Sequence, residues 1–243
     1  MLYISDIQIK EIIFFDEDYS KECFDFCNKR DIDCLPSPDD SNKIWRKGAN
    51  ANDFKLIVIP DAAKINGNKK AFDREVVEAF KENNLLFVYE GNELTGVVHF
   101  SDYNTHVVNV YLFGIFSQYE KMLKEYLRRH GVTNKAIIDS SCNKQYGSKM
   151  FQEKINKSQE LQCFYLKDVI KFANDNKKAN IRLNYDDVID LRNMVMHAHE
   201  LVDKKSSDDD NLIFDFTSFQ KFFDRVIKLN QNFLKLKNRI SLF

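Results

Sequence analysis

The sequence predicts an α+β fold, in which an N-terminal α/β repeat pair is followed by an all-α helical bundle. Residues 1–103 alternate short apolar runs of strand length with helical patterns, whereas the chain after Asn104 carries long segments with apolar residues at steps of three and four. The charge changes at the same place. Residues 1–103 carry 13 Lys/Arg against 20 Asp/Glu, a net of -7, and residues 104–243 carry 23 against 17, a net of +6. We therefore expect two domains, 1–103 and 104–243, of which the basic one better suits a phosphate-rich ligand.

The N-terminal half predicts two similar units, each with a helix, a strand, a turn and a return strand. In the first unit the expected elements are a strand at 7–15, a helix at 18–29, a short strand at 32–35, a polar turn-rich stretch at 38–53 and a buried strand at 55–59. In the second unit they are a helix at 72–83, a strand at 85–89, a tight turn at Gly91-Asn92 and a return strand at 94–100. Two such units would pack their sheets together.

The C-terminal half predicts helices only. They are expected at 105–130, 134–158, 163–176, 184–204 and 216–237. The breaks between them fall at Gly131, at the polar run 173–180 and at the acidic run 206–210, which is expected to be a solvated loop rather than a metal site. Lys235, Lys237 and Arg239 favour the C-terminus of the last helix, and contact with an RNA backbone is the alternative.

Composition argues against several classes of protein. Only 7 Gly and 3 Pro oppose long disordered segments, no window approaches the ~18 apolar residues of a membrane span, and no secretory signal is visible. The expected location is cytoplasmic, with no membrane partner. None of the cysteines forms a CxxC pair, so they are expected to be buried small hydrophobic residues in a reducing compartment; they are Cys23, Cys27, Cys34, Cys142 and Cys163.

One motif stands at the end of the N-terminal half. The strand residues Gly96-Val97-Val98 lead into Ser101-Asp102. This stretch, Leu86 to Asp102, resembles the second half of a CBS-domain pair, or Bateman module. The resemblance implies that an adenine nucleotide binds with its ribose hydroxyls on Asp102, assisted by Ser101, because a carboxylate at a strand end can accept two hydroxyl hydrogen bonds.

The chain departs from the CBS pattern in two places. His99 stands where that family has Ser or Thr, three residues before the aspartate, and the first repeat offers only Ile59-Pro60-Asp61 at the corresponding position. The alternative is that Asp102 simply caps the helix that follows it.

A second motif lies in the helix expected at 184–204, which reads Arg192-Asn193-Met194-Val195-Met196-His197. A buried stripe is expected along this helix at Val188, Leu191, Val195, Ala198 and Val202. Asn193 and His197 are four residues apart, so they share another face, and the long side chain of Arg192 can reach the same spot.

This motif resembles the active motif of the HEPN family, many of whose members are metal-independent ribonucleases. Histidine can accept the proton of a 2′-hydroxyl and protonate the leaving oxygen, and arginine can stabilise charge on the phosphate. The resemblance implies a homodimer whose two motifs form one composite site. His199 is a second candidate for the base, and it stands where some family members carry a tyrosine that is modified. The alternative is that Arg192 pairs with Asp187 or Asp190 and His197 is an interface histidine.

These observations lead to one functional hypothesis and two alternatives. The leading one is a metal-independent endoribonuclease of toxin or defence type that needs no cofactor for catalysis, with Arg192, Asn193, His197 and His199 in its site. An adenine nucleotide bound at Ser101 and Asp102 would regulate it. The alternatives are a non-catalytic, dimeric adenine-nucleotide sensor and a protein that only binds nucleic acid through its basic half.

Overall fold

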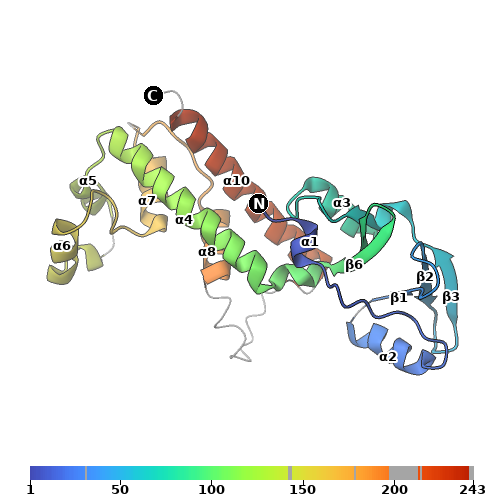
Figure 1. Ribbon diagram of the computed structural model, residues 1–243. Helices are drawn as coiled ribbons and strands as arrows, with labels where there is room; N and C mark the ends of the chain where they lie inside the picture. The colour runs from blue at the N-terminus through green and yellow to red at the C-terminus, as the bar shows by residue number, and fades with distance from the viewer. Residues whose placement is uncertain (31, 142–143, 178, 197–212, 214, 241–243) are drawn as a thin grey trace. The chain divides into compact units, whose positions relative to one another are not determined.

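The computed structural model describes residues 1–30, 32–141, 144–177, 179–196, 213 and 215–240. The fold is mixed α+β, with 55% helix, 15% strand, two small sheets and a helical C-terminal part, as predicted (Figure 1). The chain forms two compact units. We call residues 1–111, with the described residues from 213 to 223, the N-terminal unit, and residues 112–196 with 224–240 the helical unit. Helices α4 (His106–Arg129) and α10 (Phe216–Ile240) each contribute residues to both units.

The second N-terminal repeat has the predicted order of elements. Helix α3 (Arg74–Glu82) begins at Asp73, whose carboxylate accepts from Glu75 N at 3.3 Å, and it is followed by β5 (Leu85–Glu90) and β6 (Glu93–His99). Strands β5 and β6 are antiparallel and turn at Gly91, whose φ of +64° suits a residue without a side chain. The prediction missed only β4 (Lys64–Asn66), which pairs parallel with β5 and makes this repeat a β-α-β-β unit.

The first repeat is less regular than predicted. Its sheet is an antiparallel meander of β1 (Cys34–Pro36), β2 (Lys43–Lys47) and β3 (Phe54–Val58). Strand β2 lies inside the stretch expected to be turn-rich, so that expectation was wrong there. The strand expected at 55–59 exists as β3 but is not buried: it is at the sheet edge, and Leu56 and Val58 are 45% and 63% exposed.

The strand expected at 7–15 was also wrong. The chain starts with a short helix, α1 (Ile4–Ile7), and then continues as an extended segment that forms only an isolated bridge. In that bridge Ile9 and Val97 exchange hydrogen bonds of 2.9 and 3.1 Å. The next backbone hydrogen bond from this segment to a strand is made by Phe15, whose N–H donates to Pro36 O at 2.9 Å. Residues 10–14 therefore do not pair with a strand. Helix α2 (Ser20–Arg30) follows, as predicted.

The two sheets share one hydrophobic cluster, which confirms that the repeats pack together. The cluster joins Leu35 and Ile44 of the first sheet to Leu85 and Phe87 of the second. Three cysteines, Cys23, Cys27 and Cys34, are buried in it, as expected for small hydrophobic residues. Burial raises the pKa of Cys27 to about 11, which keeps its thiol neutral. Cys163 is half-buried, and Cys142 lies outside the described residues.

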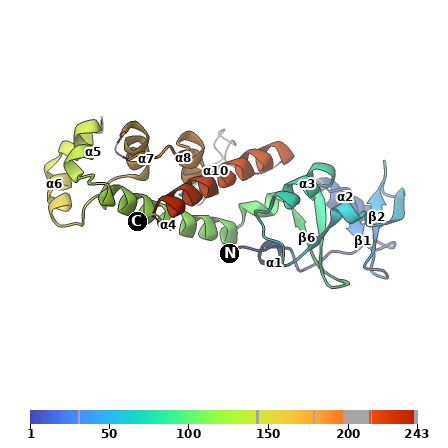
Figure 2. The same cartoon turned by 90° about the horizontal axis from the view of Figure 1, so that it is seen from above.

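The helical unit contains more breaks than predicted. It comprises most of α4 and α10 with α5 (Asn134–Ser140), η3 (Lys144–Gly147), α6 (Lys149–Asn156), α7 (Leu166–Asp175) and α8 (Asp186–Met196). The single helix expected at 134–158 was wrong, because Ser148 starts a new helix there: its hydroxyl accepts from Phe151 N at 3.3 Å. Figures 1 and 2 both place α7 between α5 and α8.

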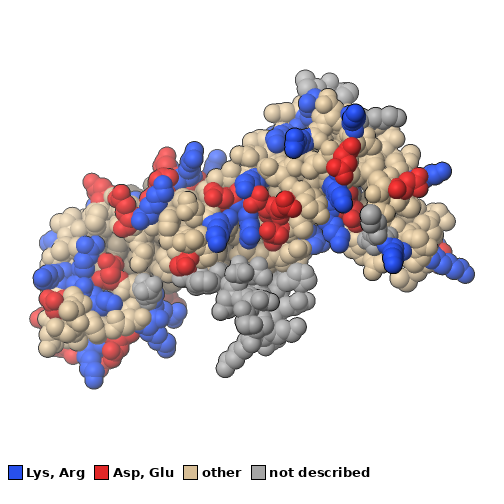
Figure 3. All heavy atoms as spheres, turned by 180° about the vertical axis from the view of Figure 1, so that it is seen from behind, with Lys and Arg blue, Asp and Glu red and all other residues tan. Residues whose placement is uncertain are grey.

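The surface of the described chain is charged and mixed. Figure 3 shows Lys and Arg side by side with Asp and Glu over the face that it presents. Among the described residues, none of the helices combines the length and the apolarity that crossing a bilayer requires.

Candidate functional sites

One cavity of the helical unit contains the first half of the C-terminal motif. It has a volume of about 730 Å³, which is ample for a nucleotide-sized ligand. Its walls come from the end of α5, from η3, from α7 and from α8. The lining residues that carry charge or hydrogen-bonding groups relevant here are Lys144, Tyr165, Lys167, Asp168, Lys171, Asp175, Arg192 and Asn193.

Helix α8 places Arg192 and Asn193 on the wall of this cavity. Its buried stripe, Val188, Leu191 and Val195, is as predicted. The stripe holds the helix against the core and leaves the next positions facing outward, so Asn193 is exposed and Arg192 half-buried. Arg192 Nη1 donates to Asn193 Oδ1 at 3.5 Å, a long contact that leaves most of the guanidinium's donors without a partner among the described residues.

The ion pair proposed as the alternative role for Arg192 is absent among the described residues. Asp187 accepts from Lys228 of α10 at 2.8 Å, and Asp190 pairs with Arg225 of the same helix at 3.4 Å. Both carboxylates therefore bind cations of α10, so the expected pairing with Arg192 was wrong, while the role of His197 in that alternative lies outside the described residues. Within the described part of the chain, Arg192 makes no ion pair at all.

The two candidate histidines, His197 and His199, lie outside the described residues, as do Ala198, Val202 and the acidic run at 208–210. No described histidine lines the Arg192 cavity. The structure therefore brings together Arg192 and Asn193. The choice between His197 and His199 as the base stays a prediction from the sequence.

The part of the cavity that η3 and α7 form consists of residues that the sequence analysis did not select. Tyr146 is buried between Phe151 and Phe164, and its hydroxyl donates to Asp168, which fixes η3 against α7. Lys167 and Lys171 follow on α7. Their spacing of four residues on an amphipathic helix, whose other side buries Val169 and Ile170, is the sequence signal that could have identified them.

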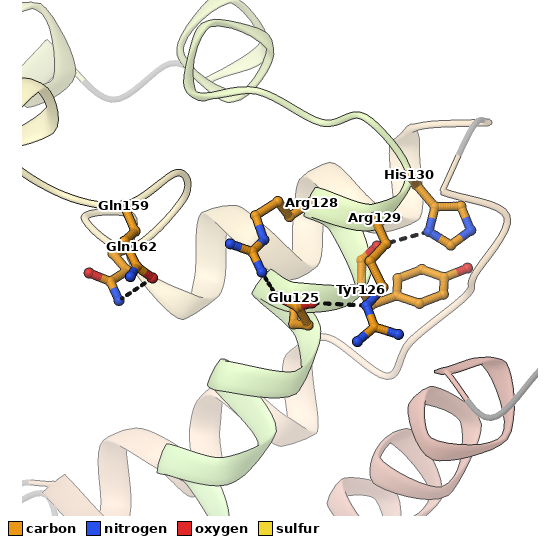
Figure 4. Close-up of polar contacts among 7 residues, drawn as sticks. All are labelled: Glu125, Tyr126, Arg128, Arg129, His130, Gln159 and Gln162. Carbon is orange, nitrogen blue, oxygen red and sulfur yellow. Dashed lines mark hydrogen bonds and ion pairs between the residues drawn. The ribbon is translucent and has the colours of Figure 1, made fainter. Parts of the chain in front are cut away.

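A second charged hollow on the helical unit differs from the Arg192 cavity because its arginines are already paired with a carboxylate. It lies along α4, and Figure 4 shows Arg128 and Arg129 both directed at Glu125. Arg129 Nε is 2.8 Å from Glu125, and Arg128 makes a second ion pair with the same carboxylate. These arginines are largely neutralised by their own helix, so this hollow is the weaker candidate for an anionic ligand.

The N-terminal unit has its own cavity, and it contains both residues selected by sequence. It has a volume of about 200 Å³ and walls that are mostly apolar, from the segment before α2, from β1 and from the β5–β6 hairpin. Its polar and charged lining residues are Glu11, Arg30, His99, Ser101 and Asp102. Asp61, from the first repeat, is fully exposed and does not line it.

Asp102 has two roles in this unit. It lies in η2 (Phe100–Asn104), and its Oδ2 accepts from His99 N at 2.8 Å, so it caps the short helix in which it lies, whereas the alternative had it capping the helix that follows it. Its Oδ1 has no hydrogen-bond partner among the described residues, although the residue lines the cavity. Burial raises the pKa of Asp102 to about 6, and the hydrogen bond from His99 and the charge of Arg30 offset only part of that effect. His99 Nδ1 in turn lies 2.8 Å from Ser101 Oγ.

No group of three or more His, Cys, Asp or Glu side chains is placed to hold a metal ion in the described part of the chain. Comparison of the chain with protein-family models, curated proteins and solved structures found no match.

Proposed function

We propose that this chain is a metal-independent endoribonuclease of toxin or defence type, built from a CBS-like sensor and a HEPN-like effector. The observation that carries the proposal is the state of Arg192. It lines a nucleotide-sized cavity beside Asn193 and has no carboxylate partner among the described residues, because α10 binds both nearby aspartates. A guanidinium that lines a cavity and has no carboxylate partner among the described residues is suited to bind a phosphate with two parallel hydrogen bonds.

The chemistry requires two further groups. His197 or His199 removes the proton from a 2′-hydroxyl, which attacks the adjacent phosphorus and expels the 5′-oxygen. A second histidine protonates that oxygen, and Arg192 stabilises the additional negative charge of the transition state. One chain supplies one motif, so two copies related by a two-fold axis would form the complete site.

The N-terminal unit would sense an adenine nucleotide. Two observations support this: the β4-α3-β5-β6 order with its parallel and antiparallel pairs, and the cavity that collects Ser101 and Asp102 at the end of β6. The open oxygen of Asp102 would accept from ribose hydroxyls, the apolar walls would hold the base, and Arg30 would bind a phosphate.

Cleavage of a labelled RNA pool in EDTA tests the nuclease. The wild type should yield fragments that end in 2′,3′-cyclic phosphate, and Arg192→Ala should be at least about a hundredfold slower. Arg182→Ala is the matched control, since Arg182 is an exposed arginine of the same unit that does not line the cavity. His197→Ala and His199→Ala, assayed separately, identify the base. Loss of cleavage on chelation would contradict the metal-free mechanism.

A non-catalytic adenine-nucleotide sensor is the second candidate, and the Asp102 cavity is what favours it. In that case the protein would bind AMP or ATP in equilibrium dialysis, with Asp102→Ala weakening the binding, while all RNAs remained intact at any nucleotide concentration.

A further inference from the structure

The cavity beside Arg192 is much larger than one arginine-bound phosphate requires, and its other lining residues include several lysines. Lys144, Lys167 and Lys171 share it with Arg192, against the carboxylates of Asp168 and Asp175. Four cationic side chains therefore face two carboxylates, which gives the lining a net positive charge. Among the described residues, none of the three lysines makes an ion pair; the pairs of the helical unit use Lys124, Arg128, Arg129, Arg225 and Lys228.

An aromatic ring stands at the same cavity. Tyr165 immediately precedes α7 and is 48% exposed, so its ring is accessible at the surface. Its ring lies 6.4 Å from that of Tyr146, at an interplanar angle of 24°, and Tyr146 is fixed by its hydrogen bond to Asp168. The exposed ring is thus held by a buried one, and such a ring is suited to stack on a base.

We propose that this cavity is a subsite for single-stranded RNA next to the scissile phosphate, with a base stacked on Tyr165 and backbone phosphates bound by Lys171, Lys167 and Lys144. The inference rests on the proposed function, because Arg192 marks where cleavage occurs. Single-stranded RNA fits best because its unpaired bases can stack on aromatic side chains while its phosphates follow a line of cations. Lys167 and Lys171 are one helical turn apart, so they can bind phosphates of one strand.

Binding of a 2′-O-methyl RNA oligonucleotide to the full chain tests the subsite, because this probe cannot be cleaved by 2′-hydroxyl attack. Lys171→Gln should weaken binding several-fold and reduce the slope of log affinity against log salt by about 0.7, the contribution of one single-strand phosphate contact. Tyr165→Ala should weaken binding about tenfold with little change in slope, and Tyr165→Phe should bind as the wild type does. Neither substitution of Tyr165 removes a helix cap, since the Tyr165 side chain makes no capping hydrogen bond.

Lys135→Gln is the control, because Lys135 is an exposed lysine of α5 that does not line the cavity; it should bind normally. Unchanged affinity and salt slope in both Lys171→Gln and Tyr165→Ala would overturn the subsite. The outcome is separable from that of the nuclease assay. Binding that depends on Lys171 and Tyr165, without cleavage by the wild type, would keep the subsite and refute the nuclease. Cleavage by the wild type, with binding that is unchanged in Lys171→Gln and Tyr165→Ala, would keep the nuclease and refute the subsite.

Discussion

Asp102→Asn should make the N-terminal unit more stable at neutral pH, although it alters a proposed ligand-binding residue. The pKa of Asp102 in the folded protein is about 6, against an ordinary value of 3.8, so the folded state holds this proton more tightly than the unfolded state does. Stability therefore decreases as the pH rises from about 4 to about 6, and the whole cost is present above pH 6. The amide of asparagine keeps an oxygen that can accept from His99 N, and it carries no charge.

The magnitude follows from the shift. A difference of about 2 pK units corresponds to about 3 kcal/mol, which we reduce to about 2 kcal/mol because the carboxylate is only half-buried. Asp102→Asn should thus raise the free energy of unfolding by about 2 kcal/mol at pH 7.5 and by little at pH 4.5.

Urea unfolding followed by tryptophan fluorescence measures this change in the relevant unit. Trp45 is the only tryptophan of the sequence, and it lies on β2, stacked on Phe15 with ring centroids 4.6 Å apart. Asp61→Asn is the matched control, because Asp61 begins the short helix after the first hairpin but is fully exposed. Equal stability of the wild type and Asp102→Asn at both pH values would refute a raised pKa for the Asp102 carboxyl group.

Three further outcomes are expected. Adenine-nucleotide affinity of the wild type should fall as the pH decreases below about 6, because protonated Asp102 loses acceptor capacity; dialysis at pH 5 and 7.5 measures this. Asp187→Ala should leave RNA cleavage within about twofold of the wild type, since Asp187 binds Lys228 and not Arg192; a large loss would show that α8 depends on this pair. Asn232→Ala should cost about 2–4 kcal/mol in urea unfolding followed by circular dichroism, because fully buried Asn232 bonds Asn184 N and O at 2.8 and 2.9 Å.

Sequence predicted well those elements whose signal is local. The β5–β6 hairpin has a glycine turn between apolar runs, and α4 has a long amphipathic period, so both lie within a few residues of where they were expected. Elements that depend on distant partners were missed. Strand β4 has only three residues and exists because β5 offers it a parallel edge, and β2 is a mixed polar segment that pairs on both sides.

The same division applies to the candidate sites. A motif within one turn of helix, such as Arg192-Asn193, can be read from the sequence because its geometry is that of the helix itself. Lys144 and Tyr165 belong to other segments, and only the packing of η3 and α7 brings them to the same cavity. Likewise, spacing alone allowed Asp187 or Asp190 to pair with Arg192; the position of α10 decided otherwise.

Several charged groups of the helical unit are already paired with other side chains. Glu125 satisfies two arginines, and Asp187 and Asp190 satisfy cations of α10, so these charges have little left to offer a ligand. Arg192 in the helical unit and Asp102 in the N-terminal unit each line a cavity, and among the described residues Arg192 has no carboxylate partner and Asp102 Oδ1 accepts no hydrogen bond. Asp102 even costs stability in its ionised form, and such a cost is offset when a ligand supplies the missing hydrogen bonds. Under the proposed function, a phosphate would bind Arg192 of the helical unit, and ligand hydroxyl groups would bind Asp102 of the N-terminal unit.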